Sequence, residues 1–133
     1  MKLIDYLNRN DRFAAAAGVQ LVEIGEGYAR AVMTVTENHV NGANVCQGGA
    51  IFTLADLAFA AAVNSGGLMT VGTSNSITYL HSAHVGDILT AEARQEDHRK
   101  MPFCETRVTN QDGVLICVMT GSAYRRQQPL FED

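Results

Sequence analysis

The chain has 133 residues, of which 47% are hydrophobic and 18% are charged, and its formal net charge is −4. These values are typical of a globular chain and exclude a largely disordered one. The length is that of one ordinary domain, so we expect residues 1–133 to form a single domain. The negative charge and the lack of a basic run longer than a pair argue against nucleic acid as a partner.

The sequence gives no sign of a secretion signal or a membrane anchor. The first twelve residues are polar and charged, and the most apolar stretch, about residues 48–63, is shorter than the ~20 residues that a membrane span needs. The three cysteines, Cys46, Cys104 and Cys117, are widely spaced and odd in number, which favours buried thiols in a reducing compartment. We therefore expect a cytoplasmic protein with no membrane contact, metal or cofactor.

In chain order, the sequence predicts two short helical segments, two strands, one long helix and then strands only. The helical segments cover residues 2–9 and 11–17, and Gly18 ends the second. The long helix covers about residues 49–63 and follows an irregular segment with an Asn41-Gly42 turn signal. The strands are expected at residues 19–25, 28–37, 68–80, 87–99, 102–110 and 114–126, with a hairpin turn at 111–113.

The long helix contains an isolated aspartate. Between Glu37 and Asp87 the only charged residue among Asp, Glu, Lys and Arg is Asp56. Because the helix is apolar on every face, we expect it to be buried on every face, with a second subunit covering what one curved sheet leaves open. The face shared with Asp56 is expected to carry Phe52, Thr53, Phe59, Ala60 and Val63.

The long helix and the segments on either side of it resemble a known family. The segment VNGANVCQGGAIFTLADLAFAAAVNSGG, followed by SITYLHSAHVGDILTAEA, is similar to hotdog-fold acyl-CoA thioesterases of the phenylacetate-degradation type, in the 4-hydroxybenzoyl-CoA thioesterase superfamily. The family pattern is Asn-Gly, then His-Gly-Gly, then a helix with an Asp nine positions after that His. Asn41, Gly48, Gly49 and Asp56 fall at matching positions, and the likeness covers about residues 18–126.

The sequence departs from the family pattern at two places. Gln47 stands where the family usually has His, and Gln can form hydrogen bonds but cannot titrate. His81-Ser82 stands where the family often has Arg-Pro before Gly-Asp. Any acid–base role at the first position is therefore lost, and contacts of the second loop with the coenzyme do not transfer.

The resemblance implies an α+β hotdog fold, with one central helix wrapped by a curved antiparallel sheet of about six strands. It also implies hydrolysis of an acyl-CoA thioester to a carboxylic acid and free CoA. A carboxylate can act as general base or as nucleophile, which is the role expected for Asp56. The backbone N–H groups of Gly48 and Gly49, at the positive end of the helix dipole, are suited to hold the oxyanion.

The spacing of these groups predicts a site between two subunits. Gly49 and Asp56 are seven residues apart, or roughly 10 Å along a helix. One carbonyl carbon cannot lie within about 3 Å of both in a single chain. Two antiparallel copies of the helix would bring Asp56 of one chain opposite Gly48 and Gly49 of the other. We therefore expect a homodimer, or a homotetramer made of two dimers.

The remaining candidates each have a simpler structural explanation. Asn41 would orient water or the thioester carbonyl, or it is a turn residue; Gln47 adjoins the glycines, or it only caps the helix. Thr73 and Ser74 would hold the substrate or water, or they lie on the solvated face of a strand. In the family a basic residue near Arg99 meets the CoA phosphates, and Lys100, Arg125 and Arg126 could assist, or all four are solvated surface charges.

Two other functions remain open from the sequence alone. A non-catalytic acyl-CoA binder or structural hotdog subunit is compatible with Gln47 replacing a titratable residue. A hotdog hydratase is disfavoured because that reaction favours an Asp-His pair and no His lies on the helix. A metal at His81 and His84 is disfavoured because no acidic or cysteine partner stands at ligand spacing.

Overall fold

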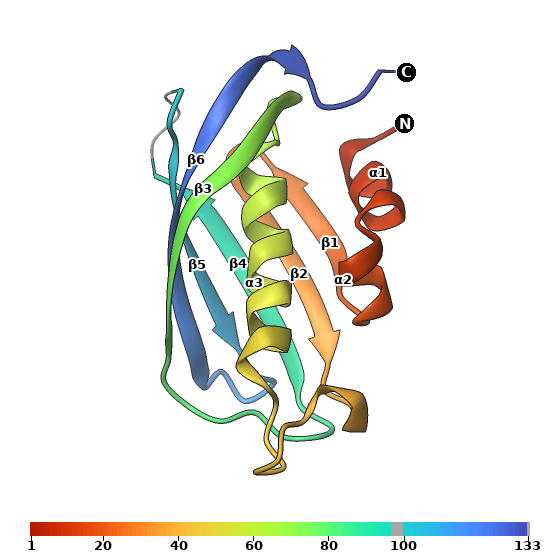
Figure 1. The fold of residues 1–133 in the computed structure, drawn as a ribbon, viewed down its shortest axis with the longest axis vertical. Helices are drawn as coiled ribbons and strands as arrows, with labels where there is room; N and C mark the ends of the chain where they lie inside the picture. The colour runs from red at the N-terminus through yellow and green to blue at the C-terminus, as the bar shows by residue number, and fades with distance from the viewer. Residues whose placement is uncertain (97–99, 133) are drawn as a thin grey trace.

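Figure 1 shows the computed structural model of the chain, which describes residues 1–96 and 100–132. A long helix, α3 (Gly48–Val63), lies in the concave face of a curved antiparallel sheet. Within the described residues the sheet has six strands in the order β1-β2-β4-β5-β6-β3. The other elements are α1 (Leu3–Asn10), α2 (Arg12–Ala16), β1 (Gln20–Gly25), β2 (Tyr28–Thr34), the 3-10 turn η1 (Glu37–His39), β3 (Leu68–Tyr79), β4 (Ile88–Gln95), β5 (Phe103–Thr109) and β6 (Leu115–Pro129).

The architecture expected from the sequence is confirmed, with small differences at the ends of elements. The helix begins one residue earlier than predicted, at Gly48. β6 runs to Pro129 instead of ending at residue 126, because it stays paired with β3 as far as Leu68. β4 ends at Gln95, and residues 97–99 of the strand predicted there lie outside the described residues. Among the described helices, none combines the length and apolarity needed to cross a bilayer.

Small side chains allow α3 to pack closely against the sheet. Ala31 of β2 is paired with Ala91 of β4, and Ala29 is paired with Ala93. All four are fully buried, as are Ala55 and Ala58 among the alanines of α3. Alanine on both sides of the contact brings the helix backbone near the strands, so the middle of α3 has a fixed position relative to β2 and β4.

One face of α3 is not covered by the chain. From Ile51 onward, the other helix positions are buried. The residues of this uncovered face are exposed or half-buried, and they are Gly49, Phe52, Thr53, Asp56 and Ala60. We call these five residues the open face of α3. The expectation that Phe59 and Val63 share this face is wrong, because both side chains are almost fully buried. Burial on every face is thus not achieved by a single chain.

The C-terminal end of α3 is held by a buried amide. Asn64, which is 4% exposed, donates from Nδ2 to the carbonyl oxygens of Ala60 and Thr70 at 2.8 and 2.9 Å. Its Oδ1 accepts from the Thr70 N–H at 2.8 Å. The guanidinium of Arg125 donates to the Val63 carbonyl at 2.9 Å. These bonds satisfy carbonyl groups at the end of the helix and tie it to the start of β3.

We expect Asn64→Ala to destabilise the protein by about 2 to 4 kcal/mol, because it leaves buried backbone groups of Thr70 without partners. Urea unfolding followed by circular dichroism measures this change. Asn10→Ala is the matched control, since Asn10 also donates from its amide to a carbonyl four residues earlier but is exposed. Equal stability of the two variants would contradict this account of the helix end.

The two edges of the sheet differ. Along β1, the side chain of Asn8 donates to the Leu21 carbonyl at 3.0 Å and accepts from the Leu21 N–H at 2.8 Å, so α1 covers that edge. At the other edge, β3 is 12 residues long and mostly exposed. Its only strand partner among the described residues is β6. A long open edge is a surface suited to pairing with another strand.

Candidate active site

The start of α3 presents two free backbone amides. The Ala50 and Ile51 N–H groups both donate to the Gln47 carbonyl, at 3.0 and 3.3 Å. Within the described residues, the N–H groups of Gly48 and Gly49 have no hydrogen-bond acceptor. Free amides at a helix start carry the positive end of the helix dipole, so these two groups can hold an anionic oxygen.

Glycine stands at positions 48 and 49 for different structural reasons. A Cβ on Gly48 would lie 2.9 Å from the ring carbon Cζ and from the hydroxyl of Tyr79, so the fold itself requires glycine there. A Cβ on Gly49 would meet only the Oε1 end of the flexible Gln47 side chain, at 2.8 Å. Gly49 is also exposed. The absence of a side chain at Gly49 therefore leaves the free amides open to a molecule from outside the chain.

Asp56 lies on the open face of α3 and is half-buried. Within the described residues, no group donates a hydrogen bond to its carboxylate and no cation forms an ion pair with it. Burial raises the pKa of Asp56 above its ordinary value, and the negative charge of Asp11 raises it further. A carboxylate with a raised pKa and no partner is a stronger base than an exposed one, and such groups concentrate at functional sites.

The raised pKa predicts a pH-dependent stability. The folded chain holds the Asp56 proton more tightly than the unfolded chain, so the free energy of unfolding falls as pH rises from the ordinary pKa through the raised one. We expect Asp56→Asn to be more stable than wild type at about pH 8 and to lose this advantage near about pH 3, where both residues are neutral. Thermal melts across this range measure the difference. A constant difference would contradict the assignment of the raised pKa to Asp56.

The structure does not bring Asp56 and the glycine amides together in one chain. Both lie on the same continuous helix. Asp56 is seven residues after Gly49, which is about 10 Å along the helix axis. Asp56 and Gly49 nevertheless both belong to the open face of α3. A second copy of the helix, running antiparallel against this face, is the arrangement that closes the distance.

Asn41 and Gln47 lie in the loop that leads into α3. Asn41 Oδ1 accepts from the N–H groups of Ala43 and Val45, at 2.9 and 3.3 Å, so its oxygen shapes the loop. Its Nδ2 has no acceptor within the described residues and remains a free donor. Gln47 is exposed and precedes the first residue of α3, but its side chain makes no capping hydrogen bond. Its amide instead lies over Gly49.

Thr73 and Ser74 are exposed residues of β3 at an irregularity in the sheet. The pairing of β3 with β6 shifts between Gly72 and Ser74, so Thr73 is the extra residue of a bulge. A bulge changes the direction in which a side chain points and is frequent beside active sites. Position Gly72 also faces Phe59 of α3, which places the bulge level with the helix turn that follows Asp56.

Of the basic candidates, Lys100 and Arg125 lie toward the end of the molecule opposite the helix start. The Lys100 carbonyl accepts from the Arg125 N–H at 2.7 Å, and Arg125 binds the last turn of α3. The Lys100 ammonium lies over the Tyr124 ring, 5.2 Å from its centre. Arg99 lies outside the described residues. The Arg125 guanidinium also donates to the Thr70 hydroxyl at 3.2 Å inside the chain.

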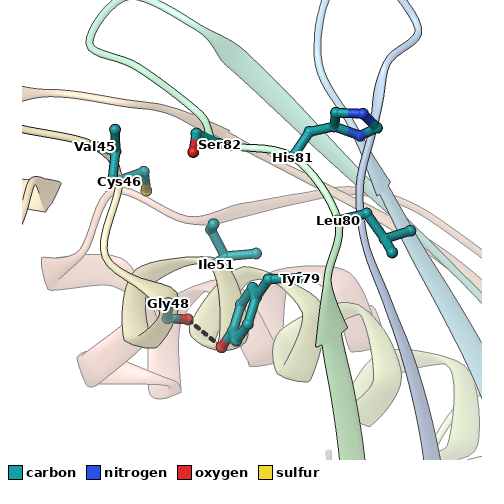
Figure 2. A pocket seen from close by; sticks show the side chains of 8 residues that line it. All are labelled: Val45, Cys46, Gly48, Ile51, Tyr79, Leu80, His81 and Ser82. Carbon is teal, nitrogen blue, oxygen red and sulfur yellow. Dashed lines mark hydrogen bonds between the residues drawn. The ribbon is translucent and has the colours of Figure 1, made fainter.

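A cavity of about 400 Å³ adjoins the start of α3 (Figure 2). Tyr79, at the end of β3, forms one wall and donates a hydrogen bond from its hydroxyl to the Gly48 carbonyl at 2.8 Å. Tyr79 was not predicted from the sequence, because nothing in a strand pattern indicates contact with a helix residue 31 positions earlier. The cavity is lined by Val45, Cys46, Gly48, Ile51, Tyr79, Leu80, His81 and Ser82.

The cysteines and loop histidines have ordinary environments. Cys46, Cys104 and Cys117 are buried and unpaired, and burial raises the pKa of the Cys46 thiol to about 11. His81 Nδ1 lies 2.8 Å from the Leu115 carbonyl. No group of three His, Cys, Asp or Glu residues suited to a metal occurs in the part of the chain that the structure describes. The Asp56 carboxylate and the free amides at the start of α3 therefore remain the groups suited to catalysis.

The curved six-stranded sheet around α3, with free amides at the helix start and a carboxylate on its open face, defines a hotdog-fold protein. The family model described as the Thioesterase superfamily matches residues 37–117, which include all of α3, β3, β4 and β5. The chain belongs to the thioesterase superfamily.

Individual relatives agree with this assignment. A putative esterase from Archaeoglobus fulgidus is 41% identical over 91% of this chain and 79% of its own length. The acyl-coenzyme A thioesterase PaaI of Escherichia coli is 37% identical over 87% of this chain and 84% of its own. The structure of E. coli PaaI, from the phenylacetic acid degradation operon, has a TM-score of 0.90 and covers 94% of this chain and 91% of its own.

A third relative was solved with a ligand. The structure of a Streptococcus mutans protein bound to acetyl CoA is 27% identical to this chain, with a TM-score of 0.79. The match covers 84% of this chain and 90% of the S. mutans chain.

Proposed function

We propose that this chain is an acyl-CoA thioesterase that hydrolyses a thioester to a carboxylic acid and free CoA in a site shared by two subunits. The observation that carries the proposal is the combination of two free amides at the start of α3 with a carboxylate of raised pKa on its open face. The similarity to E. coli PaaI and to the protein bound to acetyl CoA supports the substrate class.

In this mechanism the thioester oxygen lies against the Gly48 and Gly49 N–H groups of one subunit. The oxygen gains negative charge as the carbonyl carbon is attacked, and preorganised donors stabilise that charge. Asp56 of the other subunit either removes a proton from the attacking water or attacks the carbonyl carbon itself. In both routes the sulfur of CoA leaves and water supplies the hydroxyl of the acid.

Four further residues are proposed to surround the reacting group. The free Nδ2 of Asn41 and the amide of Gln47 lie on the loop before α3, where they can orient the carbonyl or water. Thr73 and Ser74, at the bulge of β3, can hold the substrate from the side of the sheet. The cavity beside Gly48 gives room for the group attached to the carbonyl carbon.

The dimer is supported by two surfaces that one chain leaves open. The open face of α3 includes Phe52 and Ala60, whose apolar surface gains from being covered. The edge of β3 offers 12 residues of backbone for pairing with the same strand of a second copy. A two-fold axis across these surfaces sets two helices antiparallel and yields two equivalent sites. Two such dimers would form the homotetramer.

The antiparallel arrangement also gives the basic residues a role. The Lys100 carbonyl accepts from the Arg125 N–H, and Arg125 binds the last turn of α3, so Lys100 lies toward that end of its own chain. When two helices run antiparallel, the end of one helix is nearest the start of the other. Lys100 would then lie toward the end of the partner helix that carries the partner's Gly48, and Lys100 and Arg99 are proposed to contact the CoA phosphates. The three unpaired, buried thiols favour a cytoplasmic enzyme.

The alternative function is a non-catalytic acyl-CoA binder or a structural hotdog subunit. The presence of Gln47 favours this alternative, because the titratable histidine of the family's hydrolase pattern is missing at that position. Incubation of the protein with short, medium and aromatic acyl-CoAs, followed by a free-thiol assay, tests the proposal. Thiol release with at least one acyl-CoA supports hydrolysis. Binding of acyl-CoA without thiol release would support the binder.

A further inference from the structure

The peptide bond between Gly48 and Gly49 carries a free donor on one side and a bound acceptor on the other. Its N–H, on Gly49, has no acceptor within the described residues. Its carbonyl oxygen, on Gly48, accepts the Tyr79 hydroxyl at 2.8 Å (Figure 2). Because a peptide group is planar, a contact that fixes its carbonyl also fixes the direction of its N–H.

We propose that Tyr79 is a positioning residue, which holds and polarises the Gly48–Gly49 peptide so that the Gly49 N–H points at the thioester oxygen. This inference rests on the proposed function. It assigns Tyr79 a role that acts through the peptide and needs no contact with the substrate.

The Tyr79 ring lies close to Gly48, and the strand that carries Tyr79 is held rigidly in the sheet. A Cβ on Gly48 would lie 2.9 Å from Tyr79 Cζ and Oη, so the phenol ring lies directly against the helix start. Tyr79 is paired with Cys117 of β6, and the Leu80 N–H that follows donates to the Ile116 carbonyl at 2.8 Å. The ring therefore extends from a strand held in the sheet, and it fixes the peptide relative to that sheet.

The hydroxyl also affects how strongly the peptide donates. A hydrogen bond to a carbonyl polarises the peptide group and strengthens donation by its N–H, by about 10 to 30%. Burial raises the pKa of Tyr79, with further contributions from Cys117 and Cys46, so the hydroxyl keeps its proton at neutral pH. The Gly49 N–H is thereby a better donor to an oxyanion than it would be if the Gly48 carbonyl lacked the Tyr79 hydrogen bond.

Tyr79→Phe tests the proposal, because it removes the hydroxyl and keeps the ring that packs on Gly48. We expect kcat to fall about 10-fold with KM within about 2-fold, since the lost interaction is strongest in the transition state. Tyr28→Phe is the matched control. It removes a tyrosine hydroxyl that donates to Glu92 at 2.7 Å on β2 and β4, and its kcat should equal that of wild type.

A spectroscopic measurement separates positioning from packing. A ketone analogue of acyl-CoA, with CH₂ between carbonyl and sulfur, cannot be hydrolysed and reports polarisation through its C=O stretching frequency. We expect this frequency to be higher when the analogue is bound to Tyr79→Phe than when it is bound to wild type or Tyr28→Phe. A wild-type frequency and wild-type kcat for Tyr79→Phe would overturn this inference and leave the proposed function standing. Absence of hydrolysis by wild type would overturn both.

Discussion

Replacing Asp56 by Asn is expected to reduce kcat for acyl-CoA hydrolysis by at least about 1,000-fold, while the protein remains folded and keeps the oligomeric state of wild type. Asn keeps the shape of the side chain but can neither accept the proton of water nor attack the carbonyl. The half-buried carboxylate has no hydrogen-bond partner within the described residues, so its loss breaks no contact of the single chain. Steady-state thiol release with the best acyl-CoA of the panel measures the change.

Asp5→Asn is the matched control for this variant. Asp5 is an exposed carboxylate in the first turn of α1, and its removal should leave kcat unchanged. A stable, fully active Asp56→Asn protein would remove Asp56 from the chemistry. Thermal melting distinguishes true inactivation from unfolding, because Asp56→Asn is expected to melt at a higher temperature than wild type at neutral pH.

Gly49→Val is expected to produce the second-largest loss, about 100-fold or more in kcat/KM. The branched side chain would cover the free amides of Gly48 and Gly49 and keep the thioester oxygen from reaching them. The single chain has room for it, because only the flexible end of Gln47 lies close to a Cβ at this position. The expected protein is therefore folded and poorly active, as measured by the same thiol assay.

Gly66→Val provides the control for this loss. A Cβ on Gly66 meets no atom within 4 Å, and Gly66 is exposed in the turn after α3, so its activity should match wild type. Light scattering establishes whether Gly49→Val keeps the oligomeric state of wild type. Wild-type activity of a folded, dimeric Gly49→Val protein would exclude these amides as the oxyanion donors.

The sequence predicted the helix, the strands and the chemical groups because each has a local signal. The isolation of Asp56 among apolar residues is visible without any structure, and so are the glycines at the helix start. Alternation of apolar residues identified β2, and turn residues separated β5 from β6. These features depend on neighbours in the chain, which is why the sequence was sufficient.

Contacts between distant segments were not predictable from local patterns. Nothing near Tyr79 indicates that its hydroxyl reaches Gly48, and Phe59 was assigned to the wrong face because small differences in helix rotation relative to the sheet decide burial. The role of Arg125 at the end of α3 was missed for the same reason. Each of these depends on which strand lies beside the helix, and pairing order is a property of the whole fold.

The central claim is that each site combines Asp56 of one subunit with Gly49 of the other, and mixed dimers test it directly. Asp56→Asn and Gly49→Val subunits, carrying different tags, are co-expressed and the mixed dimers are isolated. In such a dimer one site has both defects and the other has neither.

Mixed dimers should therefore recover about half of the wild-type kcat per dimer, although each parent protein retains only a small fraction of wild-type activity. If the site were formed within one chain, every site of the mixed dimer would carry one defect. Activity no higher than that of the parents, in dimers shown to contain both tags, would contradict the shared site.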